Sequence, residues 1–311
     1  MSFSVSINCC WRCNLRCPFC YLSPSQLSDS TLLDLDMLDA KLAEISQYKK
    51  ITQVDIYGGE ITLLPEQYIK DMLVVISRYY FGEGDVSIIT NLTQIPDWLY
   101  QSDLDISVSW DYIERPSSYE AVMQNMVLFS RPFHILTLVS KGMVAWDDET
   151  LQRAIDICDT LTTIQTVELK PYSSNQANQQ DVTFKEFEEF VKRWISFSPA
   201  KELVNENKIL NVLAGKGHAW SDDHIYITPT GEFAVLEFDK DNNEYFLPIY
   251  DWFDYLKWTM EETMIINTNS ICGNCEFRGR CLSEHLRPVK DFETKSCSGF
   301  KGLLEWYRNT N

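Results

Sequence analysis

Short apolar runs rich in β-branched residues alternate with longer helical patterns over the first two-thirds of the chain. The short runs predict strands at Phe3–Asn8, Thr52–Tyr57, Asp85–Thr90, Asp105–Trp110, Phe133–Val139 and Thr163–Lys170. The longer segments repeat apolar residues at helical spacing and predict helices at Thr31–Lys49, Pro65–Phe81, Pro96–Gln101, Ser118–Ser130, Asp147–Thr160 and Thr183–Phe197. Six strand–helix units in series predict an α/β fold with a parallel sheet and right-handed crossovers.

The sequence pattern changes at about Leu210. Ile225–Val235 predicts a hairpin of two short strands around a Pro-Thr-Gly turn. An aromatic-rich helix is expected at Asp251–Thr263 and a last helix at Gly302–Arg308, with four cysteines between them. We therefore predict two domains, residues 1–210 and residues 211–311.

Composition narrows the class of protein. Hydrophobic residues make up 45% of the 311 residues, enough for a sizeable core, and no apolar run is long enough for a membrane span. The formal net charge of −18 argues against a nucleic-acid partner, because a phosphate-binding surface needs clustered Lys and Arg. Ten cysteines without an apolar signal segment indicate a reducing compartment. We expect a cytoplasmic protein with no membrane partner.

A CxxxCxxC motif formed by Cys13, Cys17 and Cys20 follows the first predicted strand. Three thiolates in so short a loop can hold three corners of a 4Fe–4S cluster and leave its fourth iron open for chemistry. A zinc loop is the alternative, although a closed zinc site requires a fourth ligand and no Cys or His follows nearby. A Gly58-Gly59-Glu60 turn then follows the second predicted strand.

These two motifs together resemble the radical S-adenosylmethionine (SAM) superfamily. The resemblance implies a partial (β/α)6 barrel, TIM-like but open on one side, with reactive groups at the carboxyl ends of its strands. It implies that the open iron binds SAM, that the Gly-Gly-Glu turn holds the ammonium group of SAM, and that Phe19 packs near the adenine. Further family-like segments place the remaining SAM contacts at Asn91, Ser109, Asp111 and Arg115. Ordinary polar residues at strand ends are the alternative for these four.

A second cysteine group, Cys272, Cys275, Cys281 and Cys297, supplies enough thiolates to close a metal site, as zinc or as a fully ligated 4Fe–4S cluster. A hairpin, a helix and then CxxCxxxxxC resemble the SPASM and twitch extensions of radical SAM enzymes. Leu236 and His285 stand where the full SPASM pattern has cysteines of another cluster. The resemblance therefore implies one auxiliary 4Fe–4S cluster in a small C-terminal domain.

The resemblance also implies the class of reaction, because SPASM and twitch relatives act mostly on peptides. We expect an enzyme that oxidises or cross-links a residue of a ribosomally made peptide, with a flavodoxin or ferredoxin as electron donor. Cys9 is a candidate hydrogen-atom donor or a packing residue, and Glu237 is a candidate base. The first strand begins so early that a leader-binding domain is not expected, so the peptide would need a separate leader-binding protein or would dock directly. A small-molecule dehydrogenase or mutase, a peptide epimerase and a non-catalytic electron carrier are the alternatives.

Overall fold

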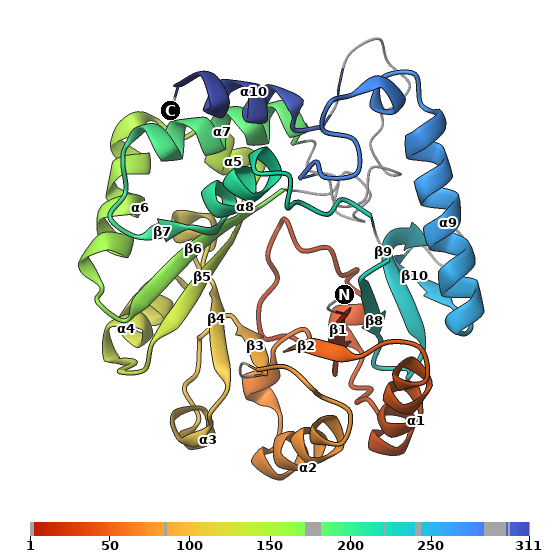
Figure 1. The fold of residues 1–311 in the computed structure, drawn as a ribbon. Helices are drawn as coiled ribbons and strands as arrows, with labels where there is room; N and C mark the ends of the chain where they lie inside the picture. Colours follow the sequence, from red (N-terminus) through yellow and green to blue (C-terminus); the bar gives the residue numbers. More distant parts are fainter. Residues whose placement is uncertain are drawn as a thin grey trace.

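The computed structural model describes residues 3–83, 86–171, 182–220, 222–239, 244–282, 297 and 299–310, and the side chains of residues 237–239, 244 and 245 lie outside this description. One sheet of ten strands runs in the order β10-β9-β8-β1-β2-β3-β4-β5-β6-β7. Figure 1 shows the strands as an open ring with most helices on its outside and the loop after β1 inside it. The sheet is not closed, so the fold is the partial barrel that the sequence predicted.

Seven strands, β1 to β7, pair in parallel and alternate with helices along the chain. The strands are β1 (Phe3–Asn8), β2 (Ile51–Tyr57), β3 (Ser87–Thr90), β4 (Asp105–Ser109), β5 (Phe133–Leu138), β6 (Ile164–Lys170) and β7 (Glu202–Leu203). The helices between and after them are α1 (Leu35–Ser46), α2 (Glu66–Ser77), α3 (Asp97–Gln101), α4 (Tyr119–Leu128), α5 (Lys141–Val144), α6 (Asp148–Thr160), α7 (Phe184–Ser196) and α8 (Val204–Leu213). All six predicted strands and six predicted helices are present, with ends that differ by a few residues.

Local signals explain where the helices begin. Asp34 caps α1 by accepting hydrogen bonds from the backbone N–H groups of Asp36 and Met37, so this helix starts later than the apolar pattern alone indicates. Thr183 and Glu186 form a reciprocal capping box at the start of α7. Side chains at these positions satisfy backbone donors that have no partner within the helix.

The C-terminal third extends the same sheet instead of forming a separate one. β8 (His224–Ile227) pairs in parallel with β1, and β9 (Phe233–Asp239) pairs antiparallel with both β8 and β10 (Glu244–Ile249). The predicted hairpin is confirmed, and β10 adds a third strand to it. The predicted boundary at residues 210 and 211 falls inside α8, and the division into two domains stays a prediction.

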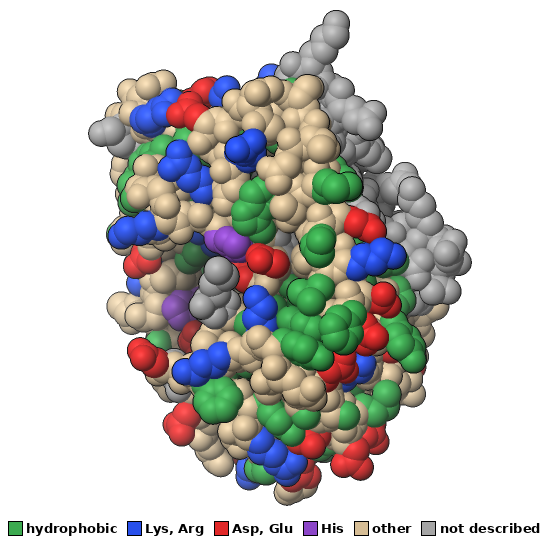
Figure 2. Space-filling model, turned by 45° about the vertical axis from the view of Figure 1, so that its right-hand side comes forward, with side chains coloured by type: hydrophobic (Ala, Val, Ile, Leu, Met, Phe, Trp, Pro, Cys, Tyr) green, Lys and Arg blue, Asp and Glu red, His purple; other side chains and the backbone are tan. Residues whose placement is uncertain are grey.

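Two long helices follow the hairpin, α9 (Trp252–Thr268) and α10 (Lys301–Thr310). The core side of α9 is aromatic: Trp252 and Tyr255 pack against Phe3 of β1, with ring centroids 5.5 and 6.1 Å apart. The outer side exposes Phe253, Met260 and Met264. Figure 2, which brings the α9 side of the molecule forward, shows hydrophobic side chains interspersed with acidic and basic ones. Among the described residues, no helix is long and apolar enough to cross a bilayer.

The two faces of β1 differ in chemistry because side chains alternate along a strand. Phe3, Val5 and Ile7 are fully buried in the main apolar core. Ser6, on the other face, lies 2.8 Å from the His224 ring on β8. The inner face of the barrel is therefore polar at β1, and the loop after β1 lies at its carboxyl end.

Candidate functional site

The cysteine loop connects β1 to α1 and gathers three thiols. Burial is the main cause that raises the pKa of the Cys20 thiol to about 12, and the nearby Cys17 and Cys13 contribute to the rise. Burial also raises the pKa values of the Cys13 and Cys17 thiols. Nearby charged groups modify these rises, and the Arg115 guanidinium opposes both of them. Arg16 fastens the loop through hydrogen bonds from its guanidinium to the carbonyls of Cys13 and Leu15, both 2.7 Å long. The three thiols therefore share one loop and affect one another's pKa, and their role as cluster ligands stays a prediction.

The Gly-Gly-Glu turn packs directly on the backbone that leads into the cysteine loop. Gly59 N–H donates to the Cys10 carbonyl across 2.7 Å, and Glu60 N–H donates to the Arg12 carbonyl across 3.0 Å. A Cβ atom on Gly59 would lie 2.2 Å from the Trp11 carbonyl oxygen, and one on Gly58 would lie 2.6 Å from that of Cys10. Only glycine allows this approach, so the motif positions the base of the cysteine loop.

The Glu60 carboxylate is fully buried and ties the ends of two strands together. Its Oε1 accepts hydrogen bonds from Thr62 N–H, from the Thr62 hydroxyl and from the Thr90 hydroxyl. Its Oε2 accepts a 2.7 Å hydrogen bond from Asn91 N–H at the end of β3. Glu60 is thus a structural centre of the site, with the lone-pair capacity left on Oε2 available to a ligand.

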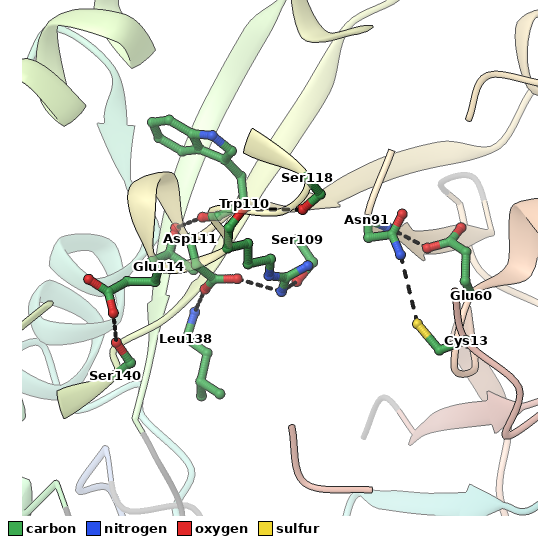
Figure 3. A network of polar contacts seen from close by, with 12 residues as sticks. Cys13, Glu60, Asn91, Ser109, Trp110, Asp111, Glu114, Ser118, Leu138 and Ser140 are labelled. Atoms are coloured by element: carbon green, nitrogen blue, oxygen red, sulfur yellow. Dashed lines mark hydrogen bonds and ion pairs between the residues drawn. The ribbon is translucent and has the colours of Figure 1, made fainter. Parts of the chain in front are cut away.

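Asn91 links this centre to the cysteine loop, as Figure 3 shows. Its amide nitrogen lies 3.0 Å from Asn14 Oδ1 and 3.9 Å from Cys13 Sγ. Asn14 in turn donates to the Thr93 hydroxyl across 2.7 Å. Hydrogen bonds therefore connect the end of β3 to the loop that carries the predicted cluster ligands.

A buried ion pair lies at the end of β4. Arg115 pairs with Asp111 and donates to the Ser109 hydroxyl across 2.7 Å, while Asp111 accepts a 2.8 Å bond from Leu138 N–H (Figure 3). Burial raises the pKa of the Asp111 carboxyl, and the Arg115 guanidinium opposes that rise. The guanidinium also lies 5.4 Å from the centre of the Phe19 ring. Three predicted SAM contacts and Phe19 therefore form one group.

Arg115 retains an unused donor. Its Nε is buried and has no hydrogen-bond partner among the described residues. Its positive charge also lowers the pKa values of Cys13 and Cys17, because Arg115 lies beside the cysteine loop. A buried, unpaired guanidinium N–H is the donor that a carboxylate ligand requires. This atom, the thiol set and the close-packed glycines fit a cluster-bound amino acid such as the methionyl part of SAM.

Aromatic residues surround the other side of the cysteine loop. Phe246 of β10 contacts the rings of Trp11, Tyr21 and Tyr226, each with centroids 5.6 Å apart. Cys13, Cys20 and Leu236 pack against the same cluster. Leu236 is therefore part of apolar packing at the position where the full SPASM pattern has a cysteine.

The second cysteine group also converges in space. Burial is the main cause that raises the pKa of the Cys272 thiol to about 11, and Cys297, Cys275 and Cys281 contribute to the rise. No three of the described His, Cys, Asp and Glu side chains, in either cysteine group or elsewhere, are placed to hold a single metal ion. His285 lies outside the described residues.

The two candidate catalytic residues are less well placed. Cys9 is fully buried in the main core, and its Sγ lies 3.3 Å from the Tyr57 carbonyl oxygen. Glu237 lies in β9, but its side chain is outside the described part of the structure. The roles proposed for both stay predictions.

The family model for the radical SAM superfamily matches residues 7–101. YydG of Bacillus subtilis (strain 168), a protein named for peptide biosynthesis, is 25% identical over 140 residues. That alignment covers 42% of this chain and 42% of YydG, so the chain matches less than half of that relative's length.

Two solved structures resemble the whole chain. The enzyme anSMEcpe with bound AdoMet and the Kp18Cys peptide has a TM-score of 0.69 at 13% identity, covering 99% of this chain and 98% of its own. Streptococcus suis SuiB bound to S-adenosylmethionine has a TM-score of 0.63 at 14% identity, covering 96% and 76%. A further SuiB structure contains the precursor peptide SuiA and has a TM-score of 0.54 at 13% identity, covering 75% and 58%. These likenesses show the fold.

Proposed function

Because this chain belongs to the radical SAM superfamily, we propose that it is an enzyme that modifies a peptide by radical chemistry. The observation that supports this most is the cysteine loop. The backbone that leads into it is hydrogen-bonded to the Gly-Gly-Glu turn, and the loop lies beside Arg115, whose Nε has no partner among the described residues. An electron carrier has no need of such a ligand pocket next to its cluster. We therefore favour an enzyme over a carrier.

Cys13, Cys17 and Cys20 would hold a 4Fe–4S cluster that, together with SAM, supplies a 5′-deoxyadenosyl radical to abstract hydrogen from a substrate. Arg115, held by Asp111 and Ser109 through Nη2, would bind the SAM carboxylate through its Nε. Glu60 Oε2 and the backbone of the glycine turn would bind the ammonium group. Phe19, stacked beside Arg115, would pack near the adenine.

We also propose an auxiliary 4Fe–4S cluster on Cys272, Cys275, Cys281 and Cys297. Mutual proximity of the four thiols supports a shared site. Four thiolates complete the ligand set of a cluster, so no iron would be open to substrate. Such a centre would accept one electron from the substrate radical that hydrogen abstraction leaves, which favours net oxidation or cross-linking. Zinc remains the competing occupant of the same thiolates.

The proposed substrate is a peptide. Support comes from the name of YydG and from the peptides named in the anSMEcpe and SuiB structures. Glu237 is the proposed base, and a flavodoxin or ferredoxin is the proposed electron donor. A separate leader-binding protein is a further proposed partner.

The test first looks for a short reading frame beside the gene that encodes a small peptide. It then combines that peptide, made synthetically, with anaerobically reconstituted protein, SAM and dithionite. We expect 5′-deoxyadenosine and a peptide that has lost two hydrogens, measured by mass spectrometry. An unchanged mass in H₂O with one deuterium gained in D₂O would indicate epimerisation instead. A peptide unchanged in both solvents would contradict the proposed function.

A further inference from the structure

Asn8, the last residue of β1, is a buried polar residue whose side chain has no hydrogen-bond partner among the described residues. Its side chain is fully buried, and neither Oδ1 nor Nδ2 has a hydrogen-bond partner among the described residues. An unpaired donor and acceptor inside a protein cost free energy, and native folds contain few of them. Retaining both on one residue therefore points to a use for the carboxamide.

The position of Asn8 places its carboxamide on the inner face of the barrel. Ser6 and Asn8 share one face of β1 because side chains alternate, and Ser6 bonds across the sheet to His224. Tyr57 is the register partner of Asn8 on β2, and Tyr226 stands opposite Ser6 on β8. The two tyrosine rings approach edge to face, with centroids 6.3 Å apart. Asn8 is thus flanked by two aromatic side chains on the same face.

This position also lies next to the cysteine loop. Tyr57 and Tyr226 pack against the aromatic cluster that includes Trp11 and Phe246. Cys13 and Cys20 pack against that same cluster. A ligand bound at Asn8 would therefore lie beside the proposed SAM cluster, where a hydrogen atom is to be abstracted.

We propose that Asn8 binds the backbone of one substrate residue in extended conformation, donating from Nδ2 to that residue's carbonyl oxygen and accepting at Oδ1 from that residue's N–H. This inference rests on the proposed function, because it names the part of the substrate that enters the barrel. Asn8 holds the substrate chain in position and takes no part in the transfer of hydrogen.

The chemistry of the carboxamide selects the ligand class. A planar amide offers one acceptor and one donor side by side, which is the complement of the N–H and C=O that one residue of an extended peptide presents on the same side of its chain. A carboxylate would leave Oδ1 unpaired, and an ammonium group would leave Nδ2 unpaired. The flanking rings of Tyr57 and Tyr226 supply apolar surface for the peptide on either side of the polar contact. Rotation of one ring opens the site, and such side-chain changes are common when a ligand binds.

Asn8→Leu tests the inference, because Leu keeps the size of the side chain and removes both unpaired polar groups. We expect the melting temperature of the variant to be unchanged or raised, because the substitution removes no hydrogen bond that the described residues make in the folded protein. The iron content should match that of the wild type. Affinity of the SAM-loaded holoenzyme for the fluorescein-labelled peptide from the neighbouring reading frame should fall at least about tenfold, measured by anisotropy. If the Leu side chain cannot be accommodated at position 8, Asn8→Ala serves as the second variant and should weaken peptide binding to a similar degree.

Ser46→Ala is the matched control. Ser46 Oγ on α1 is also buried without a partner among the described residues, but Ser46 lies outside the barrel interior. Its removal should leave peptide affinity unchanged. A clear fall in the melting temperature of both Asn8 variants would assign Asn8 a structural role and overturn the inference, as would unchanged peptide affinity in a stable variant. If the wild-type enzyme neither binds nor alters the peptide, the proposed function itself fails, and the inference with it.

Discussion

The Thr90 hydroxyl donates a 2.6 Å hydrogen bond to Glu60 Oε1, which joins the turn after β2 to the end of β3. This bond is one of four that the buried carboxylate accepts, and another comes from Asn91 N–H. Because Asn91 also approaches Cys13, the stability of the turn and the geometry of the cysteine loop depend on the same side chain.

Glu60→Gln should therefore weaken both the fold and SAM binding. The amide NH₂ cannot accept a hydrogen bond, so at least one buried donor loses its acceptor, at a cost of about 1–3 kcal/mol in the free energy of unfolding. SAM affinity should fall on the order of tenfold, because the charge that pairs with the ammonium is removed. Urea denaturation and a SAM titration followed by electron paramagnetic resonance measure the two effects. Glu66→Gln, at an exposed position of α2, should change neither. If Glu60→Gln had the wild-type free energy of unfolding and the wild-type SAM affinity, Glu60 would not be part of the site.

Arg115→Ala should be strongly destabilising. The substitution leaves Asp111 buried without its counter-charge, which typically costs about 3–5 kcal/mol. Denaturant unfolding of the metal-free protein measures this loss separately from any loss of SAM binding. Arg153→Ala breaks an exposed helix pair with Glu149 and should cost less than about 1 kcal/mol. Similar losses in the two variants would show that the Arg115–Asp111 pair is not a buried one.

Acidification should destabilise the protein in part through Glu168. Burial by itself raises the pKa of this carboxyl, but Lys170 and Lys208, whose Nζ atoms lie 2.8 and 2.7 Å from Oε1, hold it below its ordinary value. A lowered pKa in the folded state contributes stability that is present above the unfolded pKa of about 4.3. That stability is lost as the pH falls through the lower folded pKa.

Melting curves of the wild type and Glu168→Gln between about pH 7 and pH 3 check this sign. The variant should be less stable at neutral pH, and its difference from the wild type should narrow as the pH falls below about 4.3. A difference that stayed constant over the whole range would contradict the linkage. Glu66→Gln again provides the exposed carboxyl for comparison.

The two cysteine groups should have separable roles. Anaerobic reconstitution should give about eight irons per chain, the content of two 4Fe–4S clusters. Cys17→Ala should abolish reductive SAM cleavage, whereas Cys275→Ala should retain some 5′-deoxyadenosine formation without product. Cys158→Ala, in the buried face of α6, should keep the full iron content. A content of about four irons and one zinc per chain would show that the second cysteine group binds zinc and not an auxiliary cluster.

Much of the fold was predictable because its evidence is local. Strands of the barrel are short apolar runs and its helices have a regular stripe, so the alternation of β1 to β6 with helices follows from the sequence. α8 was missed because Val204–Leu213 contains three asparagines and buries only Ile209 and Val212. β10 was missed because Pro248 and the left-handed backbone of Phe246, with φ of 89°, interrupt an ordinary strand pattern.

The site was predictable to the extent that its residues are close in sequence. The spacing of Cys13, Cys17 and Cys20 makes the motif recognisable in the sequence, and in the structure the three residues share one loop. Asn8 could not be recognised, because a polar residue at the end of a strand is common and its isolation depends on distant segments. The neighbouring Ser6 contacts His224, which is 218 residues away in the sequence, and no local sequence pattern predicts such a contact.

The pairing of β8 with β1 has a consequence for the order in which the enzyme is made. The cysteine loop leaves the ribosome early, but its aromatic support from Tyr226 and Phe246 belongs to the last third of the chain. Until the hairpin is synthesised, one edge of β1 stays without its partner strand and the thiols lack that side of their enclosure. Iron–sulfur insertion into the first site should thus be a late step of maturation, after the C-terminal hairpin has docked. A truncated chain that ends before residue 224 should bind iron poorly even though it contains all three cysteines of the loop.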